Sequence, residues 1–483
     1  MGKTTLDPED WGAFRSSAHK MLDDALDKME SARDGRVWNP LPEKMKAALQ
    51  SEIPKQGLGI DELRQKLADL LPYGVGNTHP RFFGWVHGAG NPGGILAEMT
   101  AAAMNANLGG RDHGAIYVEK QVVEWCRQMM GFPAGASGLI VSGTSMATII
   151  ALKVARDQRF NFTCRQEGLS GRRLVGYASS QSHSCLGRAF DLLGLGAAAL
   201  RRIECDHNFR MDTAELEETI TRDRARGLVP FVIVGTAGSV NVGAIDDLQT
   251  INMIAEREDL WLHVDGAFGA TAVLSKDLKG RLAGLEQADS LAFDFHKWLH
   301  VNYDAGCILV RSGESHLRSF SGRPEYLAGE GQGLAAGSPW PVDFGPELSR
   351  GFRALKVWAH LLEHGVEKLG RAINENCVQA AYLAEKITAS SLFELAAPVT
   401  LNIVCFRYVS ESVNDQDELN RSIVINLQNK GIAAPSTTIL RGKLAIRVNI
   451  TNHRTECGDL DLFFEETAKI AVELERAASS NGV

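Results

Sequence analysis

The feature that most constrains the fold is a regular alternation of short apolar runs and helical patterns between residues 92 and 311. Two of the runs lead directly into helical stretches, Gly138–Val141 into Ser145–Arg156 and Leu174–Tyr177 into His183–Leu193. Further strand candidates are Val229–Val234, Leu260–Val264, Ser290–Phe293 and Gly306–Val310. Continuous apolar strands that alternate with helices are typical of a parallel sheet covered on both faces. The pattern predicts a doubly wound α/β domain with a mainly parallel sheet.

The two ends of the chain differ from this middle part. Near the N-terminus, apolar residues recur at helical spacing between Phe14 and Met29 and again over Ile60–Leu71, and these helices are too few to bury their own apolar faces. We expect them to pack on another domain or another subunit. A helix is expected at Glu347–Glu363, and the C-terminal part that follows is expected to contain strands at Leu401–Phe406 and Lys443–Ile450 and a helix at Asp459–Glu475.

These patterns predict three units within the 483 residues. An N-terminal helical segment (1–90) would pack on a partner subunit. A large α/β domain (91–355) would follow, and a small α+β domain (356–483) would end the chain.

Composition and charge argue against several classes of protein. The net charge is −8 and no Lys/Arg block stands out, so no nucleic-acid partner is expected. The eight cysteines are scattered without a CxxC pair, which argues against a metal site or a disulfide framework and favours reduced thiols in the cytoplasm. The first residues lack the apolar region of a signal peptide, and no charge-free apolar run is long enough for a membrane span.

Two charged residues follow strand candidates directly. Asp265 ends the run Leu260–Val264, and Lys297 follows the run that ends at Phe293. Taken singly, the aspartate would be a turn residue and the lysine a solvated surface charge. Ligands bind at the carboxyl ends of strands in open α/β sheets, where a carboxylate can pair with a cationic ring nitrogen. A desolvated lysine is expected to have a lowered pKa and to form a Schiff base, so the pair predicts a pyridoxal-phosphate (PLP) site.

Two more segments at strand ends fit this interpretation. Ser142-Gly143-Thr144-Ser145 lies between a strand and a helix, where backbone N–H groups and hydroxyls can bind a phosphate, although an ordinary helix cap would read the same way. His183 follows the run Leu174–Tyr177 and can stack on a flat ring, although a lone histidine is more often structural.

A competing motif is Gly88-Ala89-Gly90-Asn91-Pro92-Gly93, which matches the GxGxxG pattern of dinucleotide-binding proteins. It follows the apolar run Phe82–Val86, and Asp112 stands near the expected acid. No convincing second strand leads to Asp112, so we consider a nicotinamide or flavin enzyme the weaker alternative.

Taken together, these residues resemble the group II PLP-dependent amino-acid decarboxylases, the family of aromatic-L-amino-acid decarboxylase. The resemblance extends from about Trp11 to Ala471. Its anchors are Thr78–Gly84, Ser142–Thr148, His183, His263–Phe268, His296–Asp304, Leu348–Trp358 and Arg447–Thr455. Each is weak alone, but their order and spacing are specific. The resemblance implies the fold type I of PLP-dependent transferases, with the active site at the interface of a homodimer.

The resemblance also assigns roles to individual residues. Lys297 matches the Schiff-base lysine, Asp265 the acid on the pyridine nitrogen, and His183 the histidine stacked on the ring. Thr144 and Ser145 match the phosphate-binding turn. The remaining matches are His296, which precedes the lysine and helps to position cofactor and substrate, and the substrate-pocket segment with Phe82, Phe83 and Trp85.

The activity implied is decarboxylation of an L-amino acid, aromatic substrates first, to an amine and CO2 by a PLP-dependent carboxy-lyase. One departure leaves the product open. The family's mobile loop carries a tyrosine that protonates the substrate carbon, and the matching place falls near Trp340 or Pro341, with Tyr326 the nearest tyrosine. Relatives without this tyrosine can oxidatively deaminate and give an aldehyde in place of the amine, so an aldehyde synthase is an alternative. If the product is the amine, His296 or a residue of the partner subunit would serve as the acid in place of the loop tyrosine.

Smaller departures leave the substrate open. Asp294 stands where many relatives have an asparagine near the phosphate. Gly266 and Gly269 replace bulkier residues, and His87-Gly88 replaces a more apolar segment. These changes can alter the size and polarity of the pocket, so an acidic or small polar amino acid is a further alternative.

Overall fold

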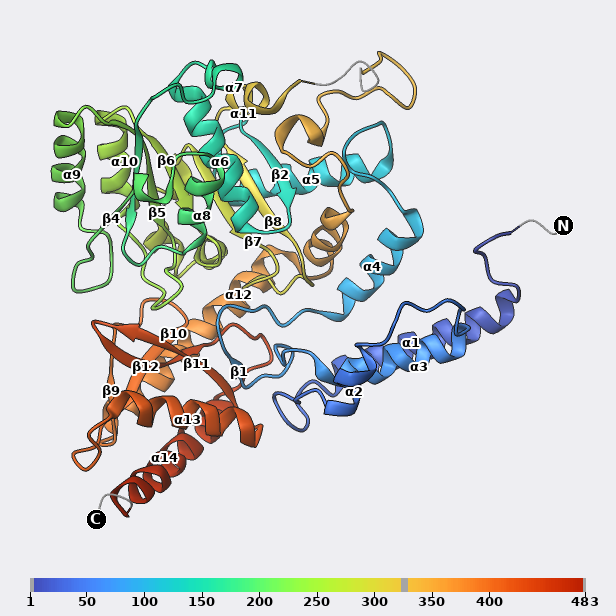
Figure 1. Ribbon diagram of the computed structural model, residues 1–483, viewed down its shortest axis with the longest axis vertical. Helices are drawn as coiled ribbons and strands as arrows, with labels where there is room; N and C mark the ends of the chain where they lie inside the picture. Colours follow the sequence, from blue (N-terminus) through green and yellow to red (C-terminus); the bar gives the residue numbers. More distant parts are fainter. Residues whose placement is uncertain (1–3, 323–328, 481–483) are drawn as a thin grey trace.

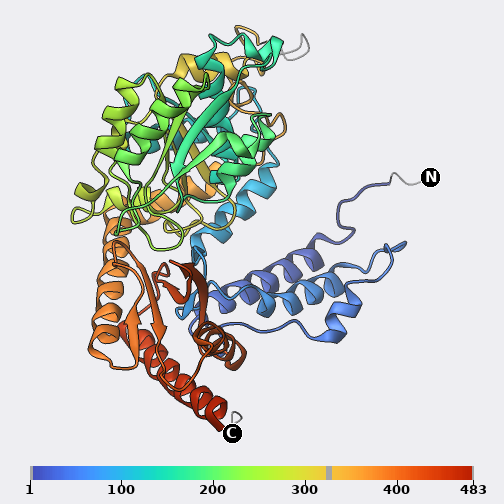
Figure 2. The same ribbon diagram turned by 60° about the vertical axis from the view of Figure 1, so that its left-hand side comes forward.

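The computed structural model describes residues 4–322 and 329–480. It contains two β-sheets and an N-terminal helical arm that projects away from both (Figures 1 and 2). No helix within these described ranges is long and apolar enough to cross a membrane.

The larger sheet has seven strands in the order β2-β8-β7-β6-β5-β3-β4. Their bounds are β2 Ser137–Val141, β3 Leu174–Ser179, β4 Leu200–Ile203, β5 Val229–Thr236, β6 Trp261–Asp265, β7 Ser290–Asp294 and β8 Gly306–Val310. Only β8 is reversed, since it runs antiparallel to both β2 and β7 while the other pairs are parallel. The carboxyl ends of the other six strands therefore lie at one edge of the sheet.

Helices cover both faces of this sheet, as the continuous apolar strands require. Val232 and Val234 of β5 pack toward α6 and α8, whereas Ile233 between them packs toward the helices of the opposite face. The first face carries α6 Thr144–Arg159, α7 Cys164–Glu167, α8 Cys185–Leu192 and α11 Gly313–Phe320, and the second carries α5 Gly114–Met129, α9 Thr213–Ala225 and α10 Leu248–Arg257. Short 3-10 turns occur at Leu71–Tyr73, Ala197–Ala199, Gly269–Leu274, Lys279–Leu282, Leu285–Gln287 and Pro341–Phe344.

The smaller sheet has the order β1-β11-β12-β10-β9 and belongs to the C-terminal part of the chain except for β1. The strands are β1 Phe82–Phe83, β9 Phe393–Leu395, β10 Ile403–Tyr408, β11 Ala434–Leu440 and β12 Lys443–Asn449, and the helices beside them are α13 Gln416–Lys430 and α14 Cys457–Ser480. Helix α12 (Arg353–Ala389) connects the two sheets and has non-helical backbone angles at Gly365. Helix α4 (Pro92–Met104) packs against α12.

The N-terminal arm consists of α1 Trp11–Glu30, α2 Glu43–Ala48 and α3 Ile60–Leu70. Helices α1 and α3 lie side by side in both views (Figures 1 and 2). The arm leaves Leu63, Leu67 and Leu70 exposed, so within one chain its apolar surface stays uncovered. Its base is fixed to the smaller sheet's side of the molecule by an ion pair between Arg33 and Asp459 at 2.8 Å.

The predicted fold class is confirmed, and the differences are local. Strand β4 was not predicted, because its two central residues are arginines, which is typical of a polar edge strand. The helix expected at Glu347–Glu363 begins only at Arg353 and extends to Ala389. Its start is delayed because the buried Arg350 side chain binds Glu119 at 2.6 Å, which holds the preceding segment in a non-helical path. The unit boundaries at 90/91 and 355/356 stay predictions.

Candidate active site

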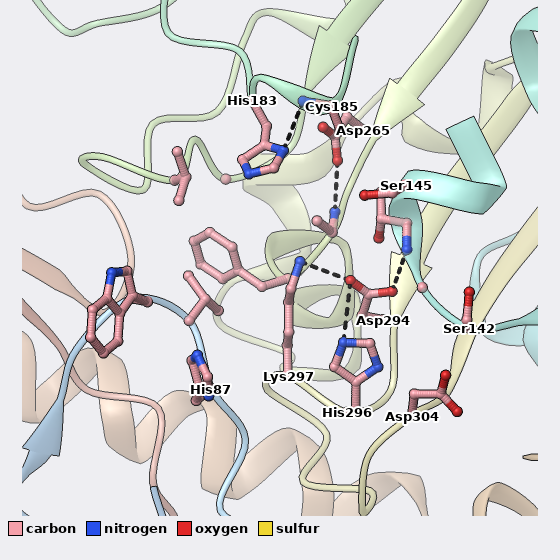
Figure 3. A pocket seen from close by; sticks show the side chains of 18 of the residues that line it. His87, Ser142, Ser145, His183, Cys185, Asp265, Asp294, His296, Lys297 and Asp304 are labelled. Carbon is pink, nitrogen blue, oxygen red and sulfur yellow. Dashed lines mark hydrogen bonds and ion pairs between the residues drawn. The ribbon is translucent and has the colours of Figure 1, made fainter. Parts of the chain in front are cut away.

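A cavity of about 510 Å³ opens at the carboxyl edge of the larger sheet. Its walls come from the ends of β2, β3, β5, β6 and β7 and from the segment that precedes α4 (Figure 3). The lining includes Thr144, Ser145, His183, Asp265, His296, Lys297 and Trp85, which are seven of the nine predicted site residues. The topology brings them together because parallel strands end at a common edge.

The amine of Lys297 forms an ion pair with an aspartate three residues earlier in the chain. Asp294 ends β7, and one of its carboxylate oxygens lies 2.7 Å from Lys297 Nζ, as Figure 3 shows. Burial would lower the pKa of Lys297, but the charges of Asp294 and Asp265 outweigh it and raise that pKa above its ordinary value. The expectation of a lowered lysine pKa was therefore wrong for the chain without its cofactor, because a buried anion stands beside the amine.

Asp265 is the last residue of β6 and is only 4 % exposed. Its Oδ1 accepts a hydrogen bond from the backbone N–H of Ala267 at 3.2 Å, which fixes the carboxylate at the strand end. Burial raises the pKa of Asp265, while Lys297 and His183 act in the opposite direction. A cation placed against this carboxylate would stabilise its charged form and so offset the desolvation energy that burial costs.

The two histidines have different surroundings. His183 faces the cavity, and its Nδ1 accepts the backbone N–H of Cys185 at 3.2 Å, which leaves the ring face free (Figure 3). His296 is buried, and its Nδ1 lies 2.8 Å from the carbonyl oxygen of Ala305. Burial lowers the pKa of both rings. Neutral imidazoles therefore face the cavity near neutral pH.

The predicted phosphate turn lies at the beginning of α6. Ser145 is exposed to the cavity, and Thr144 is buried. The Thr144 backbone N–H donates to Asp294 at 2.7 Å, so this carboxylate already occupies the first amide of the helix. We refer to Thr144, Ser145, His183, Asp265 and Lys297 as the cofactor wall.

Another part of the cavity is lined by aromatic rings. Trp85 and His87 have centroids 5.9 Å apart, and His87 and Tyr303 are 5.8 Å apart. We call Trp85, His87 and Tyr303 the aromatic wall. Phe82 packs behind it at 6.2 Å from Trp85, while Phe83 points into the core of the smaller sheet against Phe463. Of the three aromatic residues predicted at the substrate pocket, only Trp85 lines the cavity.

Tyr303 was not predicted, although it stands in the motif that begins at His296. Its ring lies 4.4 Å from the His296 ring, and burial together with the charge of Asp294 raises the pKa of Tyr303 to about 12. The phenol therefore keeps its proton. A tyrosine so close to the predicted lysine was the signal that sequence reasoning passed over.

The loop positions expected to replace the family tyrosine lie elsewhere. Trp340 is 1 % exposed, and its indole N–H donates to the carbonyl of Ala336, outside the cavity lining. Tyr326 lies outside the described residues.

Two further expectations about glycines are corrected. A side chain at Gly266 would meet Ala270 and one at Gly269 would meet the carbonyl of Ala237, so both glycines serve close packing and do not line the cavity. The GxGxxG segment that begins at Gly88 follows β1 of the smaller sheet, not a strand of the parallel sheet. It therefore lacks the βα context of a dinucleotide site.

Comparison with known proteins agrees with this site. Residues 42–409 match the family model described as the pyridoxal-dependent decarboxylase conserved domain. The chain is 33% identical over 454 residues to an aromatic-L-amino-acid decarboxylase of Bacillus atrophaeus, covering 92% of each chain. It is 30% identical over 485 residues to the Sus scrofa aromatic-L-amino-acid decarboxylase, covering 95% of this chain and 96% of that one. A crystal structure of Oryza sativa TDC with PLP and tryptamine has a TM-score of 0.89 and 26% identity, covering 98% of this chain and all (100%) of that one.

The fold and the cavity define a PLP-dependent enzyme of fold type I. The chain belongs to the pyridoxal-dependent decarboxylase family, whose members are carboxy-lyases that act on amino acids. The predicted cofactor and enzyme class are thereby confirmed.

The residues present fit this cofactor. The Oγ1 atom of Thr144 is buried at the cavity and has no hydrogen-bond partner within the described part of the chain, as expected for a donor that can bind a phosphate. Asp265 supplies a buried anion for a ring nitrogen, and Lys297 supplies a primary amine.

Proposed function

We propose that the protein decarboxylates an aromatic L-amino acid to the corresponding amine and CO2. The observation that carries this proposal is the aromatic wall, whose Trp85 and Tyr303 line the cavity and are 56% and 48% exposed. Ring pairs prefer the centroid separations of about 4.5–7 Å found in this wall, so it offers a matching surface for an aromatic side chain. The names of the relatives from Bacillus atrophaeus and Sus scrofa support the same substrate class.

We assign the cofactor wall the following roles. Lys297 would hold the cofactor covalently through its amine, Asp265 would keep the ring nitrogen protonated, and His183 would stack on the ring. Thr144 and Ser145 bind the phosphate, and His296 positions Tyr303 and Lys297. When bound, PLP supplies an electron-accepting ring that stabilises the charge left as CO2 departs. The chain's own groups orient the substrate, exclude water and return one proton to the substrate carbon.

Tyr303 is our candidate for that proton donor, since it is a protonated phenol in the cavity lining. An aldehyde synthase is the second candidate function, because the segment from Leu327 to Arg353 contains no tyrosine. In that reaction the amino acid, O2 and water yield the aldehyde, CO2, ammonia and hydrogen peroxide.

We also propose that the protein acts as a homodimer in the cytoplasm. The exposed leucines on α3 support a partner that covers the N-terminal arm. The eight cysteines are all free, which agrees with a reducing compartment. Sedimentation at several protein concentrations tests the dimer.

The experiment that tests the activity is product analysis by mass spectrometry with aromatic, acidic and small polar L-amino acids. We expect an amine and one equivalent of CO2 from aromatic substrates alone. In Tyr303→Phe we expect the amine to fall and aldehyde, ammonia and peroxide to appear. Aldehyde from the unaltered protein would favour the synthase, and turnover of acidic substrates alone would contradict the proposed substrate class.

A further inference from the structure

Asp294 binds both groups that the cofactor needs. Its Oδ1 accepts the backbone N–H of Thr144 at 2.7 Å, and its Oδ2 pairs with Lys297 Nζ at 2.7 Å. The Asp294 side chain is 2 % exposed, so water has little access to its carboxylate. One buried carboxylate therefore occupies the amide at the start of α6 and the amine of the attachment lysine.

The surrounding backbone leaves this carboxylate little room. A side chain at Gly306 would lie 2.5 Å from Asp294 Oδ1, and one at Gly143 would lie 3.5 Å from the same atom. Both positions are glycines, and their backbones pack directly against the carboxylate. The aspartate is thus enclosed beside α6 and cannot retreat toward β8.

A phosphate bound at the start of α6 would lie beside the negatively charged carboxylate of Asp294. The N-terminus of a helix attracts anions through its free N–H groups, and two anions at one amide repel each other strongly in a buried site. The neighbouring ionisable groups are Lys297, His296 and Tyr303 from the loop after β7, Asp265 from β6, His183 from the β3–α8 connection and Cys185 from the start of α8. Lys297 is the one full cation in this set, and two carboxylates already share it.

We propose that Asp294 sets the affinity of the protein for its cofactor, because its carboxylate competes with the PLP phosphate for the backbone N–H of Thr144. The inference rests on the proposed role of the α6 start as the phosphate site. It predicts that Asp294 lowers the preference of the apoenzyme for PLP over pyridoxal, which lacks the phosphate.

The test is equilibrium dialysis of the apoenzyme with PLP and, separately, with pyridoxal. In Asp294→Asn, which keeps the shape and an acceptor oxygen, we expect the ratio of PLP to pyridoxal affinity to rise at least about tenfold, equivalent to about 1.4 kcal/mol. Equal increases in affinity for PLP and pyridoxal would show that the substitution acts through Lys297, which binds both ligands, and would overturn the proposal. An unchanged or lower ratio would overturn it as well.

Asp304→Asn is the matched control. Asp304 also lines the cavity, but its carboxylate binds Arg353 Nε at 3.0 Å instead of α6, so we expect its PLP to pyridoxal ratio to stay unchanged. A gain equal to that of Asp294→Asn would show a general charge effect and overturn the proposal. Asp294→Ser supplies a second neutral variant if thermal melting shows that the asparagine variant is unfolded, and the same rise is expected.

Ser145→Ala tests the premise separately. We expect it to weaken PLP binding while leaving pyridoxal binding unchanged. If neither ligand is affected and Asp294→Asn also has no effect, the phosphate binds elsewhere and both the inference and the assigned phosphate turn are wrong. If Ser145→Ala weakens only PLP and Asp294→Asn does nothing, the inference alone fails.

Discussion

The cofactor wall and the aromatic wall line the same cavity, but they are built differently. Asp265 and Lys297 belong to ends of buried parallel strands or to the turns that follow them, and Asp265 is fixed by a backbone amide. Trp85 and His87 belong to the connection between β1 of the smaller sheet and α4. The cofactor wall therefore depends on the larger sheet alone. The aromatic wall combines Tyr303, from the loop between β7 and β8 of that sheet, with two residues of the connection that leaves the smaller sheet.

The aromatic wall is nevertheless held in place. Trp85 has a left-handed backbone (φ 48°), a conformation that costs energy for a bulky residue. Its carbonyl accepts hydrogen bonds from Arg447 at 2.9 Å and from Asn449 at 2.7 Å, both on β12. The exposed ring of Trp85 is therefore attached to a fixed backbone. We expect substitutions in the two walls to affect activity differently.

The largest expected effect is on the cofactor wall. Lys297→Ala removes the amine that binds the cofactor, so we expect decarboxylation to fall roughly 10³-fold or more. Borohydride reduction followed by peptide mass spectrometry should find the cofactor adduct on Lys297 in the unaltered protein and none in the variant. The exposed Lys276→Ala is the control and should keep the adduct. An adduct that persists in Lys297→Ala would show that another lysine holds the cofactor.

Asp265→Asn should come next. The amide cannot stabilise a protonated ring nitrogen, so we expect kcat to fall roughly 10²-fold or more while the cofactor stays attached. Steady-state kinetics and the adduct measurement separate these effects. Asp289→Asn alters a carboxylate that binds the Leu262 backbone N–H at the opposite edge of the sheet, and it should leave kcat nearly unchanged. Similar losses in both variants would mean that Asp265 acts through stability alone.

A smaller effect is expected on the aromatic wall. Trp85→Ala removes a ring from the substrate side, so kcat/KM for aromatic substrates should fall by about 10- to 200-fold, chiefly through KM. Trp85→Phe keeps a ring and should lose only a few-fold. Competition assays with aromatic and aliphatic amino acids provide the measurement. Equal losses for both substrate types would contradict a recognition role for this wall.

The smallest effect concerns the sheet beneath the cofactor wall. Burial lowers the pKa of His263 on β6 and of His316 on α11 from 6.5 to about 4. The unfolded chain binds protons below about pH 6.5 and the folded chain does not until about pH 4. The free energy of unfolding should therefore decrease as the pH is lowered through this window, by up to about 1.4 kcal/mol per pH unit for each histidine. Urea unfolding of the apoprotein at about pH 7 and about pH 5 checks this, and equal stability would contradict it.

The cofactor wall was largely predictable because each of its residues follows an apolar run, and parallel strands place their ends together. What the sequence could not reveal were contacts across the fold. Asp294 and Thr144 are 150 residues apart, and their hydrogen bond depends on strands β2 and β7 ending on either side of β8. The sign of the Lys297 pKa shift depends on the same contact.

The aromatic wall was harder to predict, since it has no periodic signal. Strand β1 has only two residues, and it joins a sheet whose other strands come from the far end of the chain. Alternation therefore could not indicate that Phe83 points into that sheet while Trp85 lines the cavity.

The hydrogen bonds from β12 to Trp85 have a consequence for how this scaffold can diversify. Arg447 and Asn449 lie outside the cavity lining, yet they fix the backbone of a residue within it. Substitutions in the smaller sheet can move the recognition surface while the strands that present Lys297 and Asp265 remain untouched. Libraries that vary β11 and β12 should therefore yield new substrate preferences in proteins that still retain the cofactor.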